Sequence, residues 1–98
     1  MALHIKWSRH ALSEFATLIN HIENDSPANA AKVSRGLLEK IDSLLTHPEQ
    51  CAPDKYKLNN DGSFRAFELH RLRVSYRYAG REIRIVRVRH TRMNPKTY

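Results

Sequence analysis

The sequence predicts an α+β fold: an N-terminal strand, an antiparallel helical hairpin and then a three-stranded antiparallel sheet. Two patterns lead to this prediction. Apolar residues recur at helical spacing between residues 9 and 45, with one interruption near residue 25, whereas residues 64–90 alternate between apolar and basic side chains. Helices grouped before strands are typical of the α+β class. A chain of 98 residues can bury one modest core, so we expect residues 1–98 to form a single domain.

The N-terminal elements have clear boundary signals. Residues 3–7 alternate between apolar and polar, as in a short strand with one buried face. Ser8 can cap the helix expected over roughly residues 9–23, because its hydroxyl can accept a free backbone N–H. Ser26-Pro27 starts a second helix, since proline suits the first helical position, and this helix should end before His47. The short connection requires the two helices to run antiparallel.

Three strands are expected after a loop over residues 48–62. They span residues 64–69, 72–78 and 82–90, and a hairpin turn at Gly80 joins the last two. We expect the helical hairpin to pack on one face of this sheet. The opposite face, which carries most of the arginines, should then be open.

The last of these strands departs from strict alternation. Ile83 and Ile85 fall on one face, but Val86 and Val88 fall on the other. This pattern indicates either a central strand that is covered on both faces or a strand that carries a β-bulge.

Basic residues concentrate in the second half of the chain. Residues 55–98 contain twelve Lys/Arg and three Asp/Glu, whereas residues 1–54 contain five and seven. Most of the basic residues there are arginines, whose guanidinium binds phosphate or carboxylate through paired hydrogen bonds. Simple solvation of an exposed sheet face is the alternative interpretation. The arginines expected to bind nucleic acid or another polyanionic target are Arg65, Arg71, Arg73, Arg77, Arg87, Arg89 and Arg92.

Residues near the C-terminus could support chemistry. An imidazole such as that of His90 titrates near neutral pH and can act as a general acid or base in phosphodiester cleavage. Arg92 could stabilise developing negative charge, and the phenol of Tyr98 could orient the attacking hydroxyl. A structural role is the more ordinary interpretation of a histidine at a strand end.

Other classes of site are not expected. The six histidines show no zinc-ligand spacing, so we predict no metal site. Cys51 lies in a proline-flanked loop without a convincing base, and the three glycines form no phosphate-binding loop, so we predict no cofactor. No apolar run approaches the length of a bilayer, and the N-terminus lacks the form of a signal peptide. We therefore expect a cytoplasmic protein without a membrane partner.

The order of these patterns resembles the RelE/ParE toxin superfamily of bacterial toxin–antitoxin modules. Phe64-Arg65-Ala66-Phe67 is similar to its "yRe" strand, and Leu72-Arg73-Val74-Ser75-Tyr76-Arg77 to its "yRiiYrv" strand. Ile85-Val86-Arg87-Val88-Arg89-His90 resembles its "i.rVlH" strand, and Leu44-Leu45-Thr46-His47-Pro48-Glu49 resembles its "L..hPe" motif. The similarity extends over nearly the whole chain.

The RelE-like branch of this superfamily consists of ribosome-dependent endoribonucleases that cleave mRNA without a metal ion. The resemblance would make the protein an enzyme whose partners are the ribosome and mRNA. The pair of lysines that RelE carries on its first C-terminal strand is replaced here by Arg65 and Phe67. The residues at positions similar to catalytic ones are Arg73, His90, Arg92 and Tyr98.

The ParE-like branch instead poisons DNA gyrase and has no recognised catalytic residues. Its C-terminal H-x-x-M-[DN] motif is similar to His90-Thr91-Arg92-Met93-Asn94, which implies that His90, Met93 and Asn94 bind the partner. The two long helices also resemble this branch. The resemblance therefore narrowly favours a toxin that arrests growth by inhibiting gyrase. Its other partner would be a cognate antitoxin in a hetero-oligomer, and a non-toxic basic nucleic-acid-binding domain remains the third interpretation.

Overall fold

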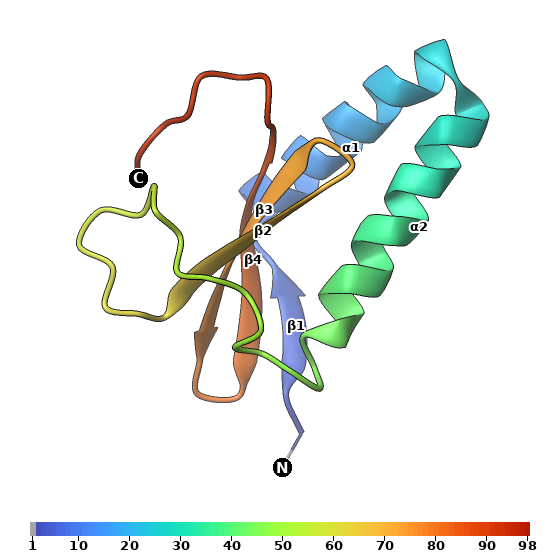
Figure 1. Ribbon diagram of the computed structural model, residues 1–98. Coiled ribbons are helices and arrows are strands. Elements are labelled where there is room, and N and C mark those ends of the chain that lie inside the picture. The colour runs from blue at the N-terminus through green and yellow to red at the C-terminus, as the bar shows by residue number, and fades with distance from the viewer. Residues whose placement is uncertain (1) are drawn as a thin grey trace.

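The computed structural model describes residues 2–98 (Figure 1). Its elements are β1 (His4–Trp7), α1 (Arg9–Asp25), α2 (Pro27–Ser43), β2 (Phe64–Leu69), β3 (Leu72–Ala79) and β4 (Glu82–His90). The predicted α+β class and the predicted order of elements are confirmed. The bounds of β2 and β4 are those predicted from the sequence.

The sheet has the strand order β1-β4-β3-β2. β2, β3 and β4 form the predicted antiparallel sheet, and β1 adds to it as a parallel neighbour of β4. A parallel pair needs a long crossover connection, and the helical hairpin forms the first part of that crossover. The hairpin packs on one face of the sheet (Figure 1); we call the other face the outer face.

Two serines cap the starts of the helices, as predicted, but α1 continues through Asp25 instead of ending near residue 23. The Ser8 hydroxyl accepts a hydrogen bond from the backbone N–H of Ala11 at 3.0 Å. The Ser26 hydroxyl accepts one from the N–H of Asn29 at 3.1 Å, while its own N–H donates to the carbonyl of Ile22 at 2.8 Å. Ser26 therefore ends α1 and begins α2, so that the chain reverses within a single residue.

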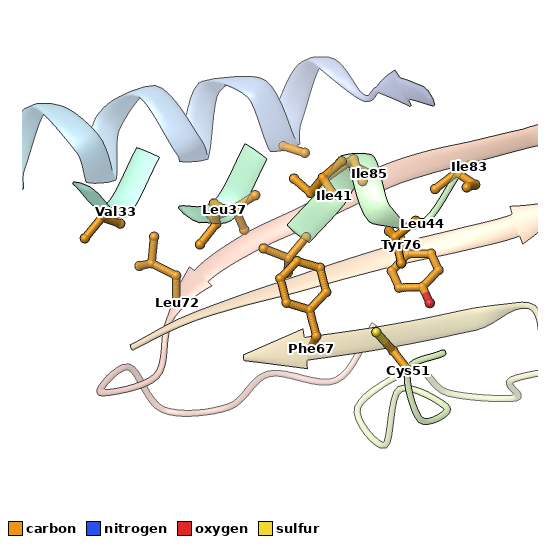
Figure 2. Packing of buried hydrophobic residues seen from close by; sticks show 13 residues of the cluster. Val33, Leu37, Ile41, Leu44, Cys51, Phe67, Leu72, Tyr76, Ile83 and Ile85 are labelled. Atoms are coloured by element: carbon orange, nitrogen blue, oxygen red, sulfur yellow. The ribbon is translucent and has the colours of Figure 1, made fainter. Parts of the chain in front are cut away.

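The core lies between α2 and the inner face of the sheet (Figure 2). Its fully buried side chains include Leu37, Ile41, Leu44, Leu72, Val74, Tyr76, Ile83, Ile85 and Val88. Three leucines at helical spacing are not buried, because a four-stranded sheet is too small to cover the whole hairpin. Leu12 is 54% exposed, and Leu38 and Leu45 are each 42% exposed.

Both features that the sequence offered as alternatives for the last strand are present, since β4 lies between β1 and β3 and carries a β-bulge. Ser75 lies opposite Arg87 and Tyr76 lies opposite Ile85, so Val86 is the extra residue. The bulge returns Val88 to the core face beside Ile85 and turns Arg87 to the outer face. Among residues 2–98, no helix has both the length and the apolar character needed to cross a membrane.

Candidate functional site on the outer sheet face

The centre of the outer face is not open, contrary to the expectation from the sequence. The second part of the loop, residues 54–62, and a C-terminal segment of residues 91–98, here called the tail, lie against it (Figure 1). Residues 48–53 instead follow the edge of the sheet, where Cys51 joins the core. The Arg73 side chain is only 17% exposed, and Ser75 beside it is buried. The reason is the negative charge of Asp54 in the loop. Its carboxylate is completely buried, pairs with the positive charge of Arg73 and holds both segments against the sheet.

Asp54 joins the loop, β3 and the tail. Its Oδ1 accepts hydrogen bonds from Arg73 Nη2 at 2.8 Å and from the backbone N–H of Tyr56 at 3.1 Å. Its Oδ2 accepts a hydrogen bond of 2.5 Å from the Tyr98 hydroxyl. Burial by itself raises the pKa of Asp54, but the hydrogen bonds from Tyr98, Arg73 and Tyr56 outweigh it, so the pKa lies below its ordinary value. Asp54 is therefore an ionised structural residue.

Tyr98 anchors the end of the tail. Its N–H donates to the carbonyl of Tyr56 at 3.0 Å, and its carbonyl accepts from the N–H of Leu58 at 2.7 Å. Its ring meets Phe64 edge-on at 6.1 Å, and the Arg87 guanidinium lies 5.3 Å from the ring centre. Burial, and then the hydrogen bond to Asp54, raise the pKa of the Tyr98 phenol. The phenol is thus held neutral and cannot act as a base near neutral pH.

A small cavity of about 50 Å³ lies beneath the tail. It is lined by the side chains that the resemblance assigned to partner binding, His90, Met93 and Asn94, together with Arg73 and Tyr98. The Nε atoms of Arg73 and Arg87 are buried without a hydrogen-bond partner among residues 2–98. A cavity of this size can hold ordered water but not a nucleotide.

The predicted target-binding arginines do not form one surface. Arg65 lies opposite Tyr76 and therefore on the helix-facing side of the sheet, contrary to prediction. Its guanidinium donates to the carbonyl of Cys51 at 2.7 Å, across the edge of the sheet. Arg71 lies in the β2–β3 turn, with a φ of 65°. Strict alternation along the strands predicted an outer-face position for both arginines, and neither of them lies there.

The remaining outer-face arginines are engaged locally. Arg73 also donates to Glu68 at 3.0 Å, and Arg77 donates to the hydroxyl of Ser63 at 3.1 Å. Arg87 approaches the Glu14 carboxylate at 3.9 Å, and Arg89 contacts the sulfur of Met93 at 3.6 Å. These contacts hold the loop and the tail in place.

His90 lies where β4 meets the tail. Its Nδ1 accepts a hydrogen bond from the backbone N–H of Arg92 at 3.0 Å, which leaves Nε2 as the donor nitrogen of a neutral imidazole. Burial, and then the positive charges of Arg92, Arg71 and His21, lower the pKa of His90. The side chain of Arg92 lies outside the cavity beneath the tail and lines a separate groove with His90 and Arg71.

Sequence reasoning missed Asp54 and Tyr56. The aromatic ring of Tyr56 lies 4.8 Å from the Arg73 guanidinium. A weak signal for Asp54 exists, since it is the last acidic residue before the strongly basic half of the chain. Within residues 2–98, no group of three or more histidine, cysteine or acidic side chains is arranged to hold a metal ion.

Comparison with known proteins agrees with this architecture. The family model described as the ParE toxin of the type II toxin–antitoxin system, parDE, matches residues 5–95. A solved structure described as the chromosomal ParDE TA system from P. aeruginosa matches with a TM-score of 0.69 and 22% identity, covering 91% of this chain and 96% of that chain. No curated protein matches the chain. Because the family model spans nearly all of the sequence, the chain belongs to the ParE toxin family of type II toxin–antitoxin systems, the ParE-like branch of the RelE/ParE superfamily.

Proposed function

We propose that this protein arrests bacterial growth by inhibiting DNA gyrase in the cytoplasm, and that a cognate antitoxin neutralises it. Membership of the ParE toxin family supports the toxin role. The observation that favours gyrase inhibition over mRNA cleavage is the hydrogen-bond network around Asp54, because it engages two residues that a RelE-like mechanism would use.

Those two residues are Arg73 and Tyr98. Both terminal nitrogens of the Arg73 guanidinium are bonded to carboxylates, one to Asp54 and one to Glu68. The Tyr98 hydroxyl donates its proton to Asp54. A guanidinium that stabilises a transition state and a phenol that orients an attacking hydroxyl must both face the substrate. In this protein they instead fasten the tail to the sheet.

The surface that we assign to the target is the outside of the tail. Met93 is 46% exposed, and Leu58 on the neighbouring loop is 55% exposed, so apolar side chains stand out here from a basic surface. Arg89 contacts Met93 and adds positive charge. Exposed methionine and leucine with arginine nearby are typical of a protein-binding surface.

The antitoxin is expected on the helical hairpin. Leu12, Leu38 and Leu45 are exposed there, and exposed apolar residues on a small domain can mark an interaction surface. The matched P. aeruginosa structure is described as a ParDE toxin–antitoxin system. An acidic, partly disordered antitoxin segment that folds on binding would suit a chain with a formal net charge of +7.

Two assays run in parallel test the proposal. Purified protein should abolish supercoiling by gyrase, while primer extension in a translating extract should show intact mRNA. Met93→Ala with Asn94→Ala should weaken gyrase inhibition, whereas Arg84→Ala should not, because Arg84 lies at the opposite end of β4 and pairs with Glu82. New ribosome-dependent mRNA ends with normal supercoiling would refute gyrase inhibition and establish a nuclease.

A further inference from the structure

A second basic site lies at the end of the helical hairpin; it adjoins the cavity beneath the tail, with which it shares His90. A groove of about 300 Å³, here called the hairpin groove, runs between the α1–α2 connection and the β2–β3 turn. The charged and titratable side chains that line it come from several elements. They are His21 and Asp25 of α1, His70 and Arg71 of the turn, His90 of β4 and Arg92 of the tail. Apolar residues of both helices, Leu18, Ile22 and Val33, complete the lining.

The geometry points to the hairpin groove as a binding site for a phosphate ester, that is, a phosphate group attached to a small, partly apolar body. This inference concerns a separate surface and does not depend on gyrase inhibition. The sequence and the resemblance assigned His90, Arg71 and Arg92 to catalysis or to a macromolecular target, but neither they nor the family match identify a small-molecule site formed with His21 and His70 at the end of the hairpin.

The charges that face the groove are unbalanced. Arg71 and Arg92 are permanently positive, and Asp25 is the one carboxylate among the described residues of the lining. Three imidazoles, those of His21, His70 and His90, add further positive charge when they are protonated. Asn29, in the first turn of α2, adds a neutral polar group at a helix end that favours anions. The permanent charges sum to +1, and one protonated imidazole would raise the sum to +2, which a group with two negative charges would balance.

The β2–β3 turn carries two of these basic residues in an unfavourable backbone conformation. His70 and Arg71 have φ values of 52° and 65°, in the left-handed region that tight hairpin turns normally fill with asparagine and glycine. Strained positions of this kind concentrate at functional sites. The sequence therefore places two cationic side chains at the groove where other residues would form the turn more easily.

Helix α2 is adapted to the same turn. Gly36 lies in the middle of α2, and a Cβ at this position would be only 2.7 Å from Nε2 of His70. Glycine weakens a helix interior, so its presence here has a packing reason: it lets the imidazole lie against the helix backbone. The β2–β3 turn and helix α2 thus both hold His70 beside the groove.

The lowered pKa of His90 is consistent with an excess of positive charge around the groove. Besides burial, the charges of Arg92, Arg71 and His21 lower its pKa. An anion in the groove would counter those charges and favour the protonated imidazole, so binding should raise the pKa of His90. Nε2 carries a proton both in the neutral imidazole, where Nδ1 accepts from the Arg92 N–H, and in the protonated one, so it can donate to a ligand in either state.

The arginines of the groove could bind either a phosphate or a carboxylate through paired hydrogen bonds. Phosphate suits the groove better because of its charge: a phosphomonoester reaches about two negative charges at neutral pH, whereas a single carboxylate carries one. A volume of about 300 Å³ lies at the lower end of small-molecule sites, and the apolar residues can cover the body of the ester.

Histidine NMR of the intact protein tests this inference, with adenosine 5′-monophosphate and inorganic phosphate as probes. Near pH 6, the monophosphate should shift the ring resonances of His21, His70 and His90 saturably. His4, His10 and His47 lie outside the groove and are internal controls that should not move.

Charge-removal variants make the test specific. Arg71→Gln and Arg92→Gln should each weaken binding, whereas Arg84→Gln, which removes an exposed arginine at the far end of β4, should not. The amide spectra of the variants establish that each is folded. Tighter binding of the monophosphate than of inorganic phosphate supports a role for the apolar residues, and equal binding supports recognition of the phosphate alone.

Three outcomes would overturn the inference. Shifts of all six histidines alike would mean non-specific ion binding. Unchanged binding in the arginine variants would place the ligand elsewhere. If both phosphate probes fail while a glutamate-rich peptide shifts the three groove histidines, the groove is a surface for an acidic protein segment instead.

Discussion

Asp54 shows how one residue can change the character of a whole surface. It is separated from Arg73 by 19 positions and from Tyr98 by 44, yet its two carboxylate oxygens bond to both side chains. A buried carboxylate without partners is very unfavourable, and this one is stabilised only because both partners are present. The face that the arginines of the sequence predicted to be open is covered for this reason.

Removing the Tyr98 hydroxyl should destabilise the protein without abolishing its activity as a toxin. We expect Tyr98→Phe to lower the free energy of unfolding by about 1.5–3 kcal/mol, because the lost hydrogen bond has a charged acceptor. The control is Tyr78→Phe, which should change it by less than about 0.5 kcal/mol, since no hydrogen bond of the Tyr78 hydroxyl is seen among the described residues. Urea unfolding gives both values. Equal effects would contradict the anchoring role of Tyr98.

The Asp54 carboxylate should make stability sensitive to acid. Its pKa is below the ordinary value in the folded protein, so its contribution is complete above the unfolded pKa of about 3.9 and is lost as the pH falls through the folded pKa. Urea unfolding between neutral pH and about pH 3 should show this loss, and Asp54→Asn should flatten the curve in that range. Asp61→Asn is the comparison: the pKa of Asp61 is also lowered, by hydrogen bonds from Ser63, so this substitution should flatten the curve too, but less, because Asp61 is exposed and its interactions are screened by solvent. A curve that Asp54→Asn leaves unchanged would disprove the assignment.

At the scale of elements, α2 and the β2–β3 turn are fitted to each other through Gly36 and His70. Alanine would ordinarily strengthen the middle of a helix relative to glycine. Here its Cβ would lie 2.7 Å from Nε2 and 3.0 Å from Cδ2 of His70, so the imidazole would have to move. The helix is therefore weakened locally in a way that positions the turn.

A double-mutant cycle tests this fit. Gly36→Ala alone should give little gain in stability, or a loss, because displacing His70 offsets the better helix propensity. In a His70→Ala background the same substitution should stabilise the protein by about 0.5–1 kcal/mol. Thermal or urea unfolding of the four proteins gives the coupling energy. A zero coupling energy would show that the two residues are independent.

At the scale of the whole molecule, the two halves of the chain complement each other in charge. The second half carries an excess of basic residues, and acidic residues of the first half neutralise part of it at fixed points. Asp54 binds Arg73, while Glu14 of α1 accepts the backbone N–H of Val88 at 3.0 Å and lies 3.9 Å from Arg87. These contacts attach the helical hairpin and the loop to the sheet, and they leave Arg71 and Arg92 as excess charge near the hairpin groove.

Reactivity of the single cysteine should report on opening of the whole fold. Cys51 is only 9% exposed and belongs to the same core cluster as Phe67 and Tyr76. A thiol reagent should therefore label it slowly, and labelling should accelerate with urea and with Asp54→Asn in proportion to the loss of stability. Labelling that responds to neither would mean that the loop of residues 48–62 opens on its own.

Most of the elements could be predicted from the sequence, because they depend on short-range interactions. The serine caps, the proline at the start of α2 and the bounds of β2 and β4 follow from the local spacing of polar, apolar and cap-forming residues, and the irregular alternation of β4 allowed a bulge without locating it. The order of the strand motifs was also sufficient to indicate the toxin superfamily, which the family match confirms.

The site could be predicted only in part. The resemblance assigned His90, Met93 and Asn94 to partner binding; the three residues line one cavity, and their binding of a partner stays a prediction. It did not indicate that Arg65 faces the helices, or that Arg73 and Tyr98 are bound to Asp54. Strand periodicity gives the face of a residue only when the register is known, and it says nothing about which distant loop will cover that face.

The sequence by itself thus determined the helices, the strands and the family of this protein, since each depends on residues close together along the chain. Only the tertiary structure decided that β1 would join the sheet beside β4, which arginines would be engaged, and where the positive charge would stay unbalanced. The physical reason is that pairing between distant strands and burial of a carboxylate depend on long-range contacts, whose partners cannot be identified from local patterns.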